Sequence, residues 1–220
     1  MTVVKRHMLG DAISKRLRKA IISGDYPHHY HLAEPQLAEQ LGVSRGPVRD
    51  ALQLLVQEGF AERLPNGRVR VKAVELQDIR NLYEFRTMLE TMAAEKWMAG
   101  GRTPFPRAEF DDILAQMEKR TITSEEFAGW DVRFHQRIVE LSGNKTLMQA
   151  WIGLEEVIQS ILEITNQGNP RAETILSHHA DIVQALAARD LQAAKATIAA
   201  HLKEAEEVMI SELGKWIPHR

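Results

Sequence analysis

Four ionisable side chains in the second half of the chain fall on helix faces where the spacing calls for apolar residues. Asp131 and His135 are one helical turn apart on one apolar stripe, and His179 and His201 accompany the stripes of two later helices. A buried carboxylate without a partner is costly, so Asp131 needs hydrogen bonds, a cation or a metal ion. One aspartate and three histidines that converge inside a bundle can bind a divalent ion. The alternative is that each histidine is an ordinary core residue with its own hydrogen bonds.

A second polar pair interrupts the apolar stripe of the helix predicted over residues 75–100. Arg86 and Glu90 are four residues apart, so their side chains meet on one helix face. One interpretation is a buried ion pair that only holds the bundle together. The other, which we favour, is that Arg86 binds a small carboxylate that is also a ligand of the metal, with Glu90 as its orienting partner.

A carboxylate bound in this way needs a metal with free coordination positions. We therefore expect an open site with five or six ligands, not a closed tetrahedral one. Aspartate and histidine accept zinc, nickel, manganese or iron, and zinc is the first choice for the isolated protein.

The segment 34–55, EPQLAEQLGVSRGPVRDALQLL, has the pattern of two short helices joined by a tight turn. Ser44 is a suitable N-cap for the second helix. Arg45, Gly46 and Arg49 lie opposite the apolar stripe of that helix. Such a helix enters the DNA major groove with its first residues at the base edges, where arginine binds guanine or phosphate. The alternative is an ordinary corner of two helices with surface arginines.

The next residues have the pattern of a β-hairpin. Strands are predicted over Phe60–Leu64 and Arg68–Val71, and Asn-Gly between them is a strong hairpin signal. We expect Asn66, Gly67 and Arg68 to lie in a wing that touches the DNA backbone or minor groove.

The composition limits the class of protein. The chain has 220 residues, 44% of them hydrophobic, and no cysteine, so it is globular and has neither disulfides nor cysteine-ligated zinc. No apolar run exceeds four residues, which excludes a transmembrane helix. The first residues lack the apolar stretch of a signal peptide. We expect a cytoplasmic protein without a membrane partner.

Charge and helical spacing divide the chain into two predicted domains. Residues 1–74 have a balance of +5 and residues 75–220 a balance of −7, which suggests an anion-binding head on an acidic body. The head is predicted as a winged helix-turn-helix. The body has only helical patterns, in about six segments: 75–100, 106–121, 124–142, 145–166, 171–188 and 191–213. The expected fold is mostly α, with an antiparallel all-α bundle as the second domain.

Two stretches of the chain resemble a known family. LAEQLGVSRGPVRDALQLLVQEGF is very similar to the DNA-binding domain of GntR-family bacterial transcription regulators. The segment 82–95, LYEFRTMLETMAAE, resembles the start of the FCD-type effector domain of their FadR subfamily, and the short body resembles its VanR-like branch. The resemblance implies a homodimer that binds palindromic double-stranded operator DNA and responds to a small organic acid.

The resemblance also assigns roles to residues. Positions that contact operator DNA in the family match Ser44, Arg45, Gly46, Arg49 and Gly67. Its metal ligands, an Asp-x-x-x-His pair with two later histidines, match Asp131, His135, His179 and His201. Some members also contact DNA through an arginine on the first helix of the motif, where this chain has Pro35, so operator preference cannot be copied from them.

Three functional interpretations follow. The first, which we favour, is a transcription regulator whose operator affinity is modulated by a carboxylate at the metal site, and not an enzyme. The second is a bundle metalloenzyme acting on a carboxylic acid. It is disfavoured because the chain contains no Glu-x-x-His and has no general base beside the ligands unless Glu90 serves. The third is a regulator that senses the metal ion itself.

Overall fold

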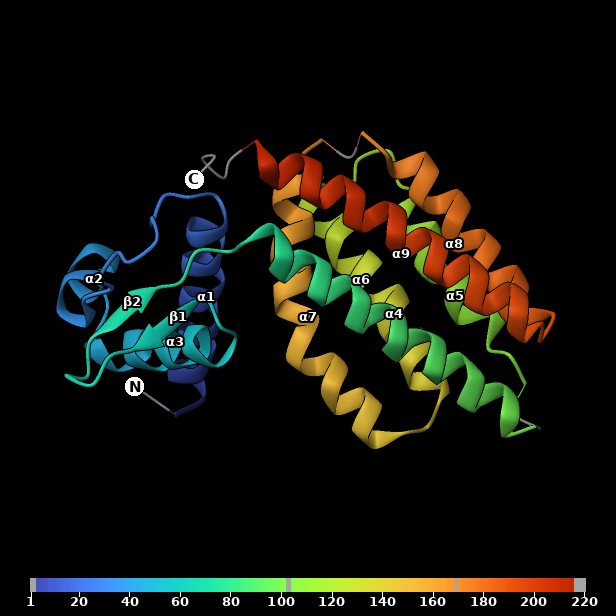
Figure 1. Cartoon of the computed structure of the whole chain (residues 1–220), viewed down its shortest axis with the longest axis horizontal. Coiled ribbons are helices and arrows are strands. Elements are labelled where there is room, and N and C mark those ends of the chain that lie inside the picture. Colours follow the sequence, from blue (N-terminus) through green and yellow to red (C-terminus); the bar gives the residue numbers. More distant parts are fainter. Residues whose placement is uncertain (1–2, 102–103, 169, 216–220) are drawn as a thin grey trace. The chain divides into compact units, whose positions relative to one another are not determined.

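A computed structural model describes residues 3–101, 104–168 and 170–215. The described residues form two compact units. One includes the chain up to Leu76 and the residues from Leu213, and the other is Gln77–Glu212. Each unit is described by itself (Figure 1). Among the described residues, no helix is long and apolar enough to span a membrane.

The first unit is a helix-turn-helix with a wing. Its elements are α1 (Val3–Ile22), α2 (Glu34–Leu41), α3 (Arg45–Gln57), β1 (Ala61–Arg63) and β2 (Val69–Val71). Helix α1 packs against α3, and the apolar stripe expected on α3 is buried: Val48, Ala51, Leu52 and Leu55. Gly42 ends α2 in the left-handed conformation, φ 65°, which makes the tight turn before α3.

The wing is shorter at both strands than the hairpin pattern predicts. β1 and β2 are antiparallel, with Ala61 opposite Val71. The turn begins at Leu64, whose carbonyl accepts the N–H of Gly67 at 2.8 Å. Gly67 has φ 80°, which a side chain disfavours, so glycine is needed there. The segment before α2 pairs with the other edge of β2 through an isolated bridge between His31 and Arg70.

The second unit consists of six helices in its described residues, as the spacing predicts. They are α4 (Leu76–Ala99), α5 (Arg107–Met117), α6 (Ser124–Leu141), α7 (Lys145–Thr165), α8 (Ala172–Ala187) and α9 (Leu191–Gly214). Helix α5 contacts both α6 and α8, and α6 also contacts α7. The predicted fold class, a winged helix-turn-helix followed by an all-α domain, is confirmed.

The N-caps of α3 and α6 differ from what residue type alone predicts. Ser44 is the N-cap of α3, but its side chain makes no capping hydrogen bond. Helix α6 is capped by Thr123 and not by Ser124. The Thr123 hydroxyl accepts the Glu126 N–H at 3.1 Å, and the Glu126 carboxylate accepts the Thr123 N–H at 2.9 Å. This reciprocal capping box satisfies two backbone donors at once.

The capping difference predicts unequal stability effects. Thr123→Ala removes half of the capping box and should lower the free energy of unfolding by about 1 kcal/mol. Ser44→Ala removes an exposed hydroxyl with no capping bond, so its effect should stay below about 0.5 kcal/mol. Urea unfolding of the full chain, followed by circular dichroism, measures both. Equal losses would contradict the assignment of the caps.

Candidate metal centre and nucleic-acid interface

The four ionisable residues on the helix faces come together in the second unit. Asp131 and His135 lie on α6, His179 on α8 and His201 on α9. All four are buried, and one ligand atom from each lies within 4.8 Å of the others. Two ligands on opposite sides of an ion at about 2.1 Å are about 4.2 Å apart, so small side-chain shifts would close this cluster around a metal.

The contacts of His135 direct one ring nitrogen to Glu90 and the other to the cluster. Its Nδ1 lies 2.6 Å from Glu90 Oε2. A carboxylate only accepts hydrogen bonds, so Nδ1 carries a proton and Nε2 is the nitrogen that faces the cluster. That atom is 3.2 Å from His201 Nε2. A histidine whose second nitrogen donates to a carboxylate is the usual arrangement around a bound metal.

His179 is the least satisfied member of the cluster. Neither ring nitrogen has a hydrogen-bond partner among the described residues, although Nε2 lies 3.4 Å from Asp131 Oδ1. Its ring stacks on Phe134, with centroids 3.9 Å apart. A buried polar group without a partner costs free energy, and a metal ion would supply the missing partner.

Burial sets the protonation of the cluster. It lowers the pKa of His179 and of His201 well below the usual histidine value, and the neighbouring positive groups add to this effect. Both imidazoles therefore stay neutral, which is the form that binds metals. Burial also raises the pKa of Asp131, against the opposing effects of His135 and Arg86. The donor set thus fits a divalent cation, whose charge would compensate the buried carboxylate.

Arg86 and Glu90 form the buried pair that their spacing predicts. Arg86 Nε donates to Glu90 Oε1 at 3.2 Å, and both side chains are at most 1% exposed. Burial acts to raise the pKa of Glu90, but His135 and Arg86 outweigh it and hold that pKa below its usual value. Arg86 Nη2 is buried without a hydrogen-bond partner among the described residues.

A pocket opens onto this cluster. It has a cavity volume of about 30 Å³ before it opens to solvent, and it is lined by Arg86, Asp131, His135 and His201 among others. Neither Glu90 nor His179 lines it. His178, which helical spacing places at the surface, is half-buried and does line it. Glu90 thus supports Arg86 and His135 from behind the pocket wall.

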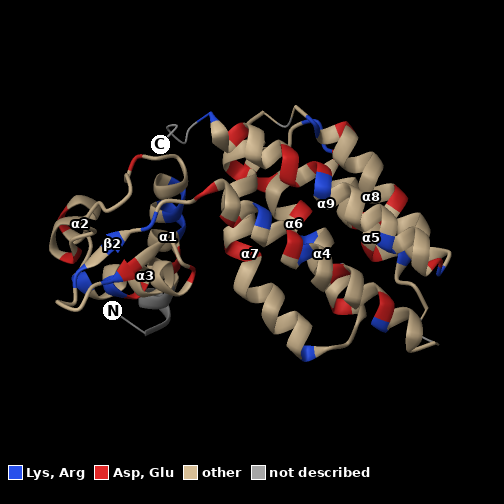
Figure 2. Ribbon diagram, in the orientation of Figure 1, with Lys and Arg blue, Asp and Glu red and all other residues tan. Residues whose placement is uncertain are grey.

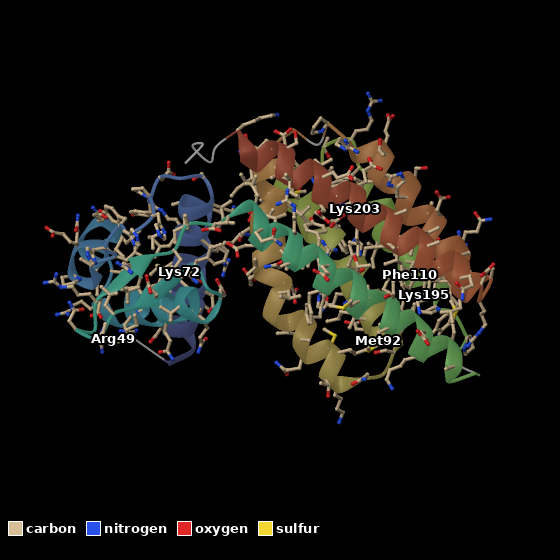
Figure 3. The ribbon with its side chains drawn as sticks, viewed as in Figure 1. Arg49, Lys72, Met92, Phe110, Lys195 and Lys203 are labelled. Atoms are coloured by element: carbon tan, nitrogen blue, oxygen red, sulfur yellow. The ribbon has the colours of Figure 1, made fainter. Side chains whose placement is uncertain are left out.

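The recognition helix of the first unit presents two exposed arginines. Arg45 and Arg49 are 62% and 60% exposed at the start of α3, and Figure 3 labels Arg49. Both donate to Glu34 at the start of α2, at 2.9 to 3.1 Å. The hydrogen bond from Arg49 is the main cause that lowers the pKa of Glu34. Sequence reasoning missed Glu34, because its role depends on the crossing of two helices.

The wing places more basic groups beside this helix. In Figure 2, Lys and Arg occur around α3 and β2. A groove with a volume of about 470 Å³ lies beside them, and Arg49, Arg63, Gly67 and Arg68 line it. Asn66 Oδ1 accepts the Arg68 N–H at 3.1 Å and thereby shapes the turn. Arg63, which the sequence analysis left out, reaches across to the Gly67 carbonyl at 3.3 Å.

Two family models match the chain. The model for bacterial regulatory proteins of the gntR family matches residues 9–71, and the FCD domain model matches residues 81–204. The chain is 32% identical over 173 residues to the Nta operon transcriptional regulator of Aminobacter aminovorans, covering 78% of this chain and 80% of that protein. It is 26% identical over 201 residues to the gluconate operon transcriptional repressor of Bacillus licheniformis, covering 85% and 79%.

Solved structures share the fold. A transcriptional regulator of the GntR type from Rhodococcus sp. RHA1 has a TM-score of 0.66 at 22% identity, over 96% of this chain and 99% of that one. The McbR/YncC protein of E. coli has a TM-score of 0.67 at 20% identity, over 92% and 97%.

The depressed histidine pKa values predict how the metal-free chain responds to pH. Unfolded histidine titrates near 6.5, so the unfolded state binds protons more readily. The stability that His179 and His201 contribute is complete above that pH and falls on acidification. With a chelator present, the melting temperature should therefore drop between pH 6.5 and about pH 5.

His179→Phe isolates the contribution of one histidine. Phenylalanine keeps a ring against Phe134 but cannot bind a proton, so the pH-dependent drop in melting temperature should be smaller than in the wild type. Melting curves of both chains across this pH range provide the measurement. An identical drop in the two chains would show that His179 is not held neutral by burial.

Proposed function

Because the chain belongs to the GntR family of bacterial regulatory proteins and has an FCD domain, it is a DNA-binding transcriptional regulator and not an enzyme, and we propose that a small carboxylate bound at a divalent metal modulates its operator affinity. The observation that carries this proposal is the buried Asp131, His135, His179 and His201 cluster beside a pocket lined by Arg86.

The cluster and Arg86 have separate roles in the proposal. The four side chains hold the ion, which when bound supplies free coordination positions to a carboxylate oxygen. Arg86 is already oriented by Glu90, and its unpartnered Nη2 is available to the same carboxylate. Arginine binds a carboxylate through a planar fork of donors, which lysine cannot reproduce.

DNA contact is assigned to the first unit. Arg45 and Arg49 would reach base edges or phosphates in the major groove, with Ser44 and Gly46 close to the backbone at the start of α3. Asn66, Gly67 and Arg68 would place the wing on the adjacent backbone or minor groove.

We also propose that the regulator acts as a homodimer on a palindromic site, since two recognition helices then read two half-sites. The exposed apolar side chains of α4 support an interface between copies. Phe85, Met88 and Met92 recur at helical spacing and are 40%, 54% and 51% exposed, and Figure 3 labels Met92.

The DNA assignment predicts the effect of one arginine. Arg49→Ala should weaken binding to the DNA upstream of the protein's own gene roughly tenfold or more, because a bidentate base contact contributes about 1–3 kcal/mol. Arg107→Ala removes the same charge from an exposed i,i+4 pair of the second unit and should leave affinity unchanged. Gel shifts at several salt concentrations measure both, and the stoichiometry of the shifted complex tests the dimer. Equal losses in the two variants would contradict the assignment.

The effector assignment predicts a selective loss. In the wild type, a carboxylate should shift operator affinity only when metal is bound. Arg86→Lys keeps a charge opposite Glu90 but loses the fork, so the response should weaken roughly tenfold while metal content and DNA binding without effector persist. Gel-shift titrations with a panel of acids, with metal or with a chelator, test this. A full response in Arg86→Lys, or none in the wild type with any acid, would overturn the proposal.

A further inference from the structure

We propose that Glu34 is a positioning residue for the reading of DNA sequence. Its carboxylate holds the guanidinium groups of Arg45 and Arg49 so that the free edge of each is set to read a guanine. This inference rests on the proposed function, in which the two arginines contact operator DNA. The observation that carries it is a set of three hydrogen bonds by which one carboxylate on α2 binds two side chains on α3.

The three hydrogen bonds converge on one group. Arg45 Nε donates to Glu34 Oε1 at 2.9 Å, and Arg49 Nη2 donates to the same oxygen at 3.0 Å. Arg49 Nε donates to Oε2 at 3.1 Å, which makes the Arg49 pair bidentate. An isolated ion pair between exposed side chains orders them little, whereas bidentate geometry or a network of charges gives such a pair weight. Glu34 is 19% exposed, far less than the two arginines, so it is the more fixed partner.

The bonds to Glu34 use one edge of each guanidinium and leave another edge free. A guanidinium is planar, with a side edge formed by Nε and Nη2 and an end edge formed by Nη1 and Nη2. Glu34 binds both nitrogens of the side edge in Arg49, and Nε in Arg45. The end edge of each arginine keeps an N–H on both nitrogens, and such a pair of donors matches O6 and N7 of guanine. DNA can therefore bind both arginines without breaking their bonds to Glu34.

The location of Glu34 keeps its carboxylate charged and in place. Glu34 is the first residue of α2, where the positive end of the helix dipole favours a carboxylate. The hydrogen bond from Arg49 is the main cause that lowers the pKa of Glu34. Arg45 and Arg49 are four residues apart on α3, a spacing at which two like charges repel. Without the carboxylate between them, the two guanidinium groups would separate and lose their common orientation.

A shared carboxylate has two other possible roles, as a mask of the arginines or as a tie between two helices. A mask occupies the donors that DNA needs, whereas the end edges of both arginines are free here. A tie is hardly needed, because α2 and α3 already contact each other and each has its own buried apolar residues. The three roles predict opposite or absent effects on one measurable quantity, the preference for guanine.

The guanines that the two arginines read are identified first. Selection from a randomised double-stranded DNA library with the full chain gives the preferred site. The same selection with Arg45→Ala and Arg49→Ala shows which guanines lose their preference. Fluorescence anisotropy then gives Kd for the selected duplex and for a duplex in which those G·C pairs are A·T. The ratio of the two Kd values measures discrimination, and general attraction to DNA cancels because both duplexes carry the same phosphate charge.

Glu34→Gln tests the role of the carboxylate. Glutamine keeps the length of the side chain but has one acceptor oxygen, so it cannot bind both arginines as Glu34 does. A bidentate arginine–guanine contact gives roughly five- to hundredfold discrimination. In Glu34→Gln the ratio should fall several-fold, toward the values of the two alanine variants, while preference at all other positions is unchanged. Glu39→Gln removes the same charge from an exposed residue of α2 and should leave the ratio as it is.

The direction of the change decides between the three roles. A wild-type ratio in Glu34→Gln would make the carboxylate a tie between helices, and a higher ratio would make it a mask. Either result overturns this inference and leaves the DNA-contacting arginines in place. If neither Arg45→Ala nor Arg49→Ala changes the preference at any guanine, the DNA contact assigned to these arginines is wrong, and this inference fails with it.

Discussion

The carboxylate of Glu90 is fully buried and is bound on both of its oxygens. Arg86 donates to one oxygen and His135 to the other. The Glu90 side chain therefore orients both the guanidinium of Arg86 and the imidazole of His135, which is one of the proposed metal ligands. Removing one member of such a buried network leaves a charge without its partner, which costs about 3–5 kcal/mol. The geometry of the pocket wall therefore depends on this interaction more than on any exposed ion pair of the unit.

The Asp131 and His179 side chains beside this network have a cost in stability. His179 lacks hydrogen-bond partners in the described structure, and Asp131 has its pKa raised by burial. Apolar residues at these positions would pack in the bundle without either penalty. Positions that break the local rules of a well-packed helix are where function is expected, and here they share one cluster of possible metal ligands.

Helical spacing accounts for much of what the sequence predicts correctly. The same period that marks Val48 and Leu52 as buried also marks Asp131, His135 and His179 as polar residues on buried faces, and all are buried. The six helices of the second unit follow from that period, since each has one apolar face.

What the sequence could not show are contacts between separate elements. Glu34 precedes Arg49 by fifteen residues, and Glu204 follows Arg171 by thirty-three. Neither pair lies on one helix, so no period reveals it. At the start of α6, the neighbouring Thr123 and Ser124 are both good N-cap residues, and only the backbone conformation selects Thr123.

The carboxylate of Glu34 has a consequence for how the regulator finds its site. Two arginines that share one carboxylate present a net charge of +1 and not +2 to the DNA backbone. Fewer displaced counterions mean weaker attraction to DNA of arbitrary sequence. The protein then stays for a shorter time at each wrong site, and a larger part of its search is spent in transit between candidate sites.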